Sequence, residues 1–179
     1  MPEPWVSEVI DFWFSLKPEQ WWKADPDLDS EVRERFLDLW QEQSGRPVQD
    51  FLGSPEEALA AVILFDQFPR NMHRGHADSF ATDHLALGIA KAAVERGYDD
   101  RLSPTQRGIL YMPFQHSEDL DDQQRSVALF TALGDDDQLD YAKKHRDVIE
   151  RFSRFPHRNP MLGRTPRPDE VAAGDVVPW

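Results

Sequence analysis

The chain of 179 residues contains no cysteine. Disulfide bonds, thiolate metal sites and a cysteine nucleophile are therefore excluded, because each requires a sulfhydryl group. A chain of this length can still fold without such staples, since a single core can bury roughly 70% of the unfolded surface. We expect one helical domain over residues 1–179, with an irregular tail rich in proline and arginine from about residue 156 packing on it.

The sequence also lacks a long hydrophobic run. Its longest apolar stretch, residues 58–65, is far shorter than the ~20 residues needed to cross a bilayer. The first residues do not show a basic segment followed by an apolar one, so they do not resemble a secretion signal. We therefore expect a cytoplasmic protein that does not enter a membrane. Dinucleotide-binding, P-loop, zinc-protease and serine-hydrolase motifs are missing as well.

Basic residues are scarce relative to acidic ones. The chain has 20 Lys and Arg against 33 Asp and Glu, which gives a formal net charge of -13. Binding to nucleic acids depends on neutralising phosphates, so this balance disfavours nucleic-acid and anionic-membrane partners. Residues 151–167 are the exception, because they contain five arginines, one histidine and no acid. Such a local positive region can attract a small anion.

Apolar residues recur at helical spacing along most of the chain, and no segment alternates as a half-buried strand would. The helix from Pro55 opens with a capping box of Ser54 and Glu57 and is apolar on nearly all sides, as is typical of a buried central helix. Pro69 and Pro113 are expected to end their helices. The pattern predicts helices over residues 5–16, 29–44, 55–68, 80–96, 103–112, 120–134 and 139–155, the second of them capped by Asp29. The fold class predicted is all-α, either an antiparallel helical bundle or a short α-solenoid.

One pattern occurs twice, Phe-x-x-Phe-Pro followed by basic residues and an asparagine, at residues 65–71 and 152–159. On its own it indicates helix termination, because proline stops the helix and basic side chains oppose the dipole. It also gathers donors that bind carboxylates or phosphates, and two arginines from separate segments can form a clamp. The predicted ligand-binding residues are Arg70, Asn71, Arg74, His157, Arg158, Asn159 and Arg164.

A third polar segment, residues 116–118, lies between the two copies. His116 is the candidate for proton transfer, because imidazole titrates near neutral pH, and Glu118 or Asp66 could orient it. The alternative is that Ser117 or Asp119 caps the next helix while His116 bonds a backbone carbonyl group. Suitable metal ligands occur, but not at a recognised spacing, so neither a metal nor a cofactor is predicted.

Four strings together resemble a bacterial family known as domain of unknown function 924. They are Asp-Phe-Trp-Phe at residues 11–14, Leu-Phe-Asp-Gln-Phe-Pro-Arg-Asn at 64–71, Pro-Phe-Gln-His-Ser-Glu-Asp at 113–119 and Phe-Pro-His-Arg-Asn at 155–159. The resemblance covers nearly the whole chain and implies an all-helical fold similar to tetratricopeptide-repeat proteins. It implies no activity. Gln115 stands where the family pattern has Glu, which weakens any mechanism that needs an acid at that position.

These observations lead to three hypotheses about function. The leading one is a helical domain that binds a small carboxylate or phosphate compound in a pocket of Arg, His and Asn side chains. The second is a hydrolase in which His116 is the general base and the arginines stabilise an oxyanion. The third is a helical-repeat scaffold that binds a peptide terminus in a groove.

Overall fold

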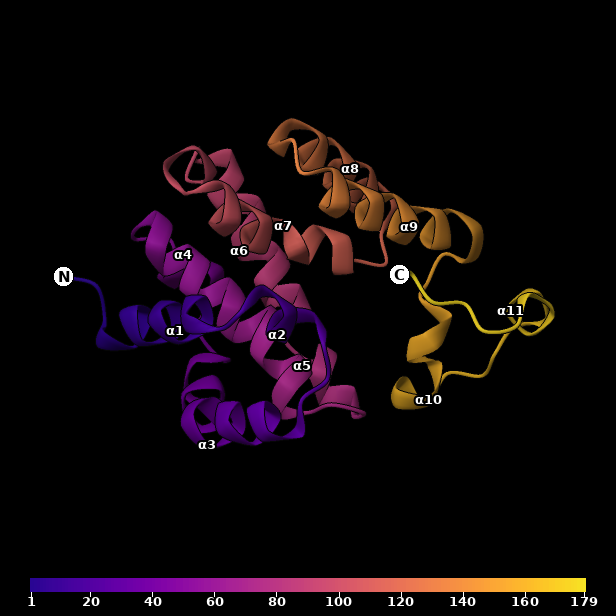
Figure 1. Ribbon diagram of the computed structural model, residues 1–179, viewed down its shortest axis with the longest axis horizontal. Coiled ribbons are helices and arrows are strands. Elements are labelled where there is room, and N and C mark those ends of the chain that lie inside the picture. Colours follow the sequence, from indigo (N-terminus) through magenta and orange to yellow (C-terminus); the bar gives the residue numbers. More distant parts are fainter. The chain divides into compact units, whose positions relative to one another are not determined.

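The computed structural model describes residues 1–179 and is all-α, with no β-strand (Figure 1). The all-α prediction is therefore confirmed. By its internal contacts the chain divides into two compact units, Met1–Leu110 (unit 1) and Tyr111–Trp179 (unit 2). Helix α7 (Pro104–His116) runs across this division. None of the helices combines the length and the apolarity that a membrane span requires.

Prolines begin most of the helices of unit 1. Their fixed φ suits the first helical turn, where the missing N–H would have no partner in the helix. The helices are α1 (Pro4–Ser15), α2 (Pro18–Trp22), α3 (Pro26–Gln43), α4 (Pro55–Val62), α5 (Phe68–Met72) and α6 (Asp83–Glu95). The 3₁₀ helices η1 (Val48–Phe51), η3 (Ala77–Phe80) and η4 (Asp99–Arg101) lie in the connections.

The core of unit 1 is built around α4, which is buried along almost its whole length, as its apolar composition predicts. Phenylalanines from α1, α3 and α5 also pack against one another in this core. The ring centroids of Phe12 and Phe36 lie 5.2 Å apart, and those of Phe36 and Phe68 lie 4.5 Å apart. Truncating such a ring to Ala typically costs about 3–5 kcal/mol, so these contacts fix how α1, α3 and α5 pack together.

The helix that begins at Pro55 does not end near residue 68, in contrast to our expectation. It passes through a π-helical turn, η2 (Ile63–Gln67), and continues as α5 to Met72. Within this turn the Phe68 N–H donates to the Ile63 carbonyl group, five residues earlier. Single π turns inside α-helices are rare and occur often at functional sites.

Pro69 is accommodated because another side chain replaces its missing hydrogen bond. A normal helix would use the N–H of residue 69 to satisfy the Phe65 carbonyl group, but proline has no N–H. The Thr82 hydroxyl donates to that oxygen instead, at 2.7 Å. The Trp40 indole N–H in turn donates to the Thr82 hydroxyl oxygen at 3.1 Å. Pro69 therefore changes the local hydrogen-bonding pattern, but the helix continues past it.

Two further boundaries differ from the sequence prediction. The N-cap of α3 is Asp25, whose carboxylate accepts two backbone amides of the first turn, and not Asp29. Asp25 directly precedes Pro26, the first residue of α3, and has the extended backbone that an N-cap requires. Pro113 lies inside α7, which continues to His116. At both helices the surrounding residues, and not a single aspartate or proline, determine where the helix begins or ends.

Unit 2 consists of the end of α7 and the elements α8 (Leu120–Leu133), α9 (Asp136–Phe152), η5 (Pro156–Arg158), α10 (Asn159–Leu162) and α11 (Pro168–Ala173). Gly134 adopts a φ of 80° and lets the chain reverse between α8 and α9. The end of α9 and Phe155 form a small apolar core, against which Ala173 and Val176 of the tail pack. The tail is thus more regular than its proline content suggests.

Candidate functional site

In unit 1, Arg70 is held by two carboxylates. Its Nη1 and Nη2 donate to the two carboxylate oxygens of Asp83 at 2.8 and 3.0 Å, a bidentate pair. Nη1 also lies 3.7 Å from Oδ1 of Asp66, whose side chain is fully buried in the π turn. Burial lowers the pKa of Arg70, but the attraction of Asp83 and then of Asp66 outweighs it and raises the pKa above its ordinary value. The guanidinium therefore stays charged and neutralises these acids.

Asn71 and Arg74 share a single acceptor, Asp29 on α3. The Asn71 amide donates to Oδ1 of Asp29 at 2.9 Å. Arg74 donates to both oxygens, through Nε at 2.7 Å and through Nη2 at 3.0 Å. The donors of the first Phe-x-x-Phe-Pro copy are thus directed at carboxylates of unit 1, where they link α5 and the turn after it to α3.

In unit 2, side chains cap the C-terminal carbonyl groups of α7. The two hydrogens of Nε2 of Gln123, which is fully buried, serve the carbonyl groups of Gln115 at 2.7 Å and Ser117 at 2.6 Å, and the Phe114 carbonyl oxygen lies 3.4 Å from the same nitrogen. Nη2 of Arg158 donates to the carbonyl group of His116 at 3.0 Å. These carbonyl groups form the negative end of the helix dipole, which favours a cation. The site thereby fixes the backbone of His116 and the position of Arg158 together.

His145, His157 and Arg158 lie against the ring of Phe155, and His116 lies beside His145; we call the three histidines and Arg158 the imidazole–arginine cluster. The ring centroids of His116 and His145 lie 6.3 Å apart, and His145 lies 5.6 Å from Phe155. Phe155 and His157 are 5.8 Å apart. The guanidinium carbon of Arg158 lies 4.6 Å above the Phe155 ring. Residues from α7, α9 and η5 therefore meet in one place.

The members of the imidazole–arginine cluster differ in exposure. His116 and His157 are half-buried, whereas His145 and Arg158 are buried. Burial, followed by the nearby His116, lowers the pKa of His145 to about 3, and Arg158 and His157 act in the same direction. His145 is therefore neutral at physiological pH. The sequence does not identify His145 as a site residue, because a single histidine in an amphipathic helix gives no local signal.

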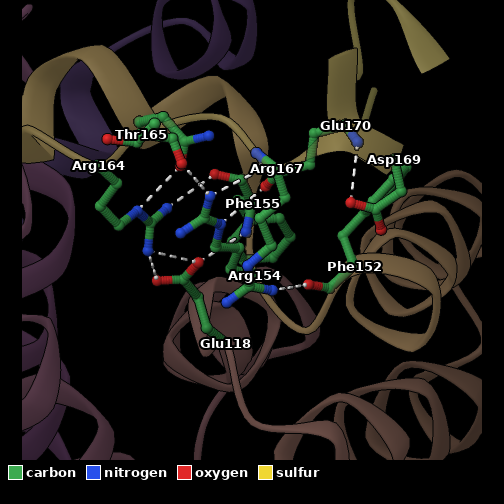
Figure 2. Close-up of polar contacts among 10 residues, drawn as sticks. Glu118, Phe152, Arg154, Phe155, Arg164, Thr165, Arg167, Asp169 and Glu170 are labelled. Atoms are coloured by element: carbon green, nitrogen blue, oxygen red, sulfur yellow. Dashed lines mark hydrogen bonds and ion pairs between the residues drawn. The ribbon is translucent and has the colours of Figure 1, made fainter. Parts of the chain in front are cut away.

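Glu118 and Arg164, both predicted site residues, bind each other (Figure 2). Nη1 of Arg164 lies 2.9 and 3.1 Å from the two Glu118 oxygens. Oε2 of Glu118 also accepts the Phe155 amide at 2.6 Å. Arg164 donates further to Oδ1 of Asn159 at 3.0 Å and to the Phe155 carbonyl group at 2.9 Å. These bonds tie the segment that carries His157 to the residues just after α7.

A second ion pair fastens α11 to the end of α9 (Figure 2). Nε and Nη2 of Arg154 donate to the two oxygens of the buried Glu170 at 2.7 and 2.8 Å. The hydrogen bond from Arg154 is the main cause that lowers the pKa of Glu170 to about 2, and the Arg167 amide contributes. Nη1 of Arg167 donates to the Phe152 carbonyl group at 3.0 Å. Most arginines of the basic stretch thus position the tail.

The structure divides the predicted site residues between the two units. Those in unit 1 are Asp66, Arg70, Asn71 and Arg74. Those in unit 2 are His116, Glu118, His157, Arg158, Asn159 and Arg164. In unit 1 Arg70 is directed at Asp83 and Asp66, whereas Asn71 and Arg74 are directed at Asp29. The convergence of the two sets stays a prediction. No group of three or more His, Asp or Glu side chains is placed to hold a metal ion.

The comparisons with known proteins agree with the resemblance found in the sequence. The chain is similar to the solved structure of ATU0120, a protein of unknown function from Agrobacterium tumefaciens, with 40% sequence identity and a TM-score of 0.88 over 94% of this chain and 95% of that chain. No curated protein matches. The family model described as "Bacterial protein of unknown function (DUF924)" matches residues 9–173, which include both Phe-x-x-Phe-Pro copies. The chain therefore belongs to the DUF924 family of bacterial proteins of unknown function.

Proposed function

We propose that the protein binds a small anion, a carboxylate or a phosphate, at the imidazole–arginine cluster. The observation that carries this proposal is a buried guanidinium close to imidazole side chains: Arg158 is 6% exposed, donates to the His116 carbonyl group and lies over the Phe155 ring, which His145 and His157 also contact. Arginine and histidine are the side chains that bind carboxylates and phosphates most directly, through charge-assisted hydrogen bonds.

The electrostatics of the cluster support an anionic ligand. His116, Arg158 and His157 each contribute to the lowered pKa of His145, as neighbouring groups that can carry a positive charge do. Glu118, the acid closest in sequence to His116, is already bound to Arg164 and to a backbone amide. A positive region on a protein with a net charge of -13 focuses small anions without attracting a polyanion.

The cluster is also held in place before any ligand arrives. Gln123 and Arg158 fix the end of α7, and the Glu118–Arg164 pair fixes the segment that leads to His157. Preorganised donors lose little conformational entropy on binding, so more of the interaction energy appears as affinity. His116 and His157 are half-buried, so a ligand from solvent can reach their rings.

Isothermal titration calorimetry at low ionic strength tests the proposal, with inorganic phosphate, acetate and citrate as probes. We expect at least one of them to bind with a dissociation constant in the millimolar range or tighter. Arg158→Lys should weaken binding about tenfold or more, because lysine cannot reproduce the planar fork of the guanidinium. His157→Gln is a second test variant, to be used if Arg158→Lys does not fold. Lys143→Gln, at an exposed position of α9, removes a positive charge outside the cluster and should leave the affinity unchanged.

Absence of binding by all three probes to folded protein would refute the proposal. So would equal affinities in wild type, Arg158→Lys and His157→Gln. Weakening by Lys143→Gln to the same extent would show a diffuse charge effect instead of a site, because that side chain lies outside the cluster.

Other roles of the predicted residues stay predictions. Ligand binding by Arg70, Asn71 and Arg74 competes with their bonds to Asp83 and Asp29. Catalysis by His116, with Glu118 or Asp66 as its orienting group, stays a prediction, and Glu118 would have to leave its bonds to Arg164 and the Phe155 amide to take this role. A tetratricopeptide-like solenoid that binds a peptide terminus is the third possibility, and the terminal carboxylate of such a peptide would be a ligand of the same chemical kind.

A further inference from the structure

The neutral ring of His145 has one nitrogen that can accept a hydrogen bond, whereas the guanidinium of Arg158 can only donate. Nδ1 of His145 lies 2.7 Å from the carbonyl oxygen of Tyr141, one turn earlier in α9. A carbonyl oxygen can only accept, so Nδ1 carries the hydrogen. The side chain is 8% exposed, and burial disfavours a second proton on the ring. Nε2, at the end of the ring farther from the backbone, therefore has a lone pair and accepts.

The ring of His145 lies beside the ring of His116, which is half-buried. His116 and His145 have ring centroids 6.3 Å apart and an interplanar angle of 50°. Hydrogen bonds of about 2.8 Å from each ring allow one oxygen atom to contact both. The Phe155 ring packs edge-on against His145 and excludes water from one side, which strengthens hydrogen bonding on the other.

We propose that the anion bound by the imidazole–arginine cluster carries its own hydroxyl donor, which donates to Nε2 of His145. This inference rests on the proposed anion site and narrows its ligand to a hydroxycarboxylate or a protonated phosphate. An anion with acceptor oxygens only would place a negative oxygen against the lone pair of Nε2. Sites with a buried polar group reject analogues that leave the group without a partner.

Pairs of anions that differ by one hydroxyl group test the inference by calorimetry at pH 7.5. Inorganic phosphate keeps a P–OH group at this pH, whereas sulfate has none and carries at least as much charge. The second pair is 2-hydroxypropionate and propionate. We expect phosphate to bind about tenfold or more tightly than sulfate, or the hydroxy acid to exceed propionate by the same factor. The pair that shows the preference identifies whether the donor is P–OH or C–OH.

Two substitutions assign the preference to His145. His145→Phe keeps the ring volume but removes the acceptor, so the preference for the hydroxyl-bearing anion should fall to less than about twofold. His145→Gln keeps an acceptor oxygen and should retain part of the preference. His84→Gln, at an exposed position of α6, is the matched control and should change nothing. Retention of the full preference in His145→Phe would overturn the inference.

Two further outcomes are distinguishable. Equal binding of phosphate and sulfate, and of the two carboxylates, by wild type would overturn the hydroxyl requirement while leaving the anion site intact. Lack of binding by every probe would instead overturn the proposed function. Nitrogen-15 NMR of the His145 ring provides a reading that needs no substitution: we expect Nδ1–H and an unprotonated Nε2 from pH 6 to 8. A proton on Nε2 in this range would also overturn the inference.

Discussion

The two copies of the Phe-x-x-Phe-Pro pattern fold differently. In unit 1 the helix continues through Pro69, because a π turn and the Thr82 hydroxyl compensate for the missing N–H. In unit 2 the helix ends at Phe152, and Ser153 takes a left-handed φ of 61° before Pro156 begins η5. The comparison shows that proline fixes where the hydrogen-bonding pattern must change, whereas tertiary contacts decide whether the helix ends there.

The arginines of the two copies also meet different partners. Arg70 pairs with Asp83 and Asp66, so its charge is neutralised inside unit 1. Arg158 donates to the His116 carbonyl group at the negative end of α7 and lies over the Phe155 ring, which His145 and His157 also contact. We therefore assign a stabilising role to the first copy and a ligand-binding role to the second, and the following experiments test that contrast.

Removing the charge of the first copy should have the largest effect on stability. Arg70→Met leaves Asp66 and Asp83 without their cation, and breaking such a buried pair costs about 3 kcal/mol of unfolding free energy. Urea denaturation measures this loss. Arg74→Met is the matched control, because its side chain is 46% exposed and its pair with Asp29 should contribute about 1 kcal/mol or less. A lower anion affinity in Arg70→Met would contradict the assignment of a purely stabilising role to the first copy and would indicate that Arg70 contributes to anion binding.

Acid should destabilise the protein through His145. The pKa of the ring is near its ordinary value of 6.5 in the unfolded chain and about 3 in the folded protein. The stabilisation is therefore complete above about pH 6.5 and is lost as the pH falls toward 3, by about 1.4 kcal/mol per pH unit. Urea denaturation at pH 7, 6 and 5 should show this slope in wild type. His145→Phe should reduce it, and an unchanged slope would mean that the ring is not held neutral.

Breaking the pair between Glu118 and Arg164 should have a smaller effect on stability. Glu118→Gln weakens a charge-assisted bond and should cost about 1–2 kcal/mol. A double-mutant cycle with Arg164→Met isolates the coupling between the two side chains. The same variants should also weaken anion binding, because the pair positions the segment that carries His157. Additive losses, with no coupling, would contradict a direct bond between them.

The smallest effect concerns the hydroxyl that supports Pro69. Thr82→Val removes the donor to the Phe65 carbonyl group at nearly constant volume and should cost about 1 kcal/mol. In a Pro69→Ala background, residue 69 regains its N–H, so Thr82→Val should cost less there. Thr131→Val, at an exposed position of α8, is the control and should be nearly neutral. Equal costs in both backgrounds would show that the hydroxyl does not replace the missing helix bond.

Features set by neighbouring residues could be predicted from the sequence. Ser103 and Gln106 form a capping box, as serine three residues before glutamine predicts, with the Ser103 amide donating to Gln106 at 3.0 Å and the Gln106 amide donating to Ser103 at 3.3 Å. Ser54 accepts the Glu57 amide as expected, although the Glu57 carboxylate reaches the amide of Gly53. The central helix was found from its apolar residues on all sides. Such patterns act within one or two turns, where the sequence alone determines the geometry.

The residues in and around the imidazole–arginine cluster are brought together from positions far apart in the sequence. Fewer of them could therefore be predicted from the sequence. His145 becomes part of the cluster through His116, which is 29 positions earlier by residue number, and through Phe155. Gln123 caps α7 from the following helix, and an isolated glutamine carries no signal of that role. Glu118 and Arg164 were both selected from the sequence, but as ligand-facing groups, because their pairing across 46 positions could not be read from either segment.

Histidine NMR during a phosphate titration tests the central claim most directly. The six histidines divide equally, with His73, His76 and His84 in unit 1 and His116, His145 and His157 in unit 2. We expect phosphate to shift the ring signals of the three in unit 2 in a saturable manner and to leave those of unit 1 unchanged. Saturable shifts confined to His73, His76 or His84, or no shifts at any histidine, would contradict the assignment of the anion site to the imidazole–arginine cluster.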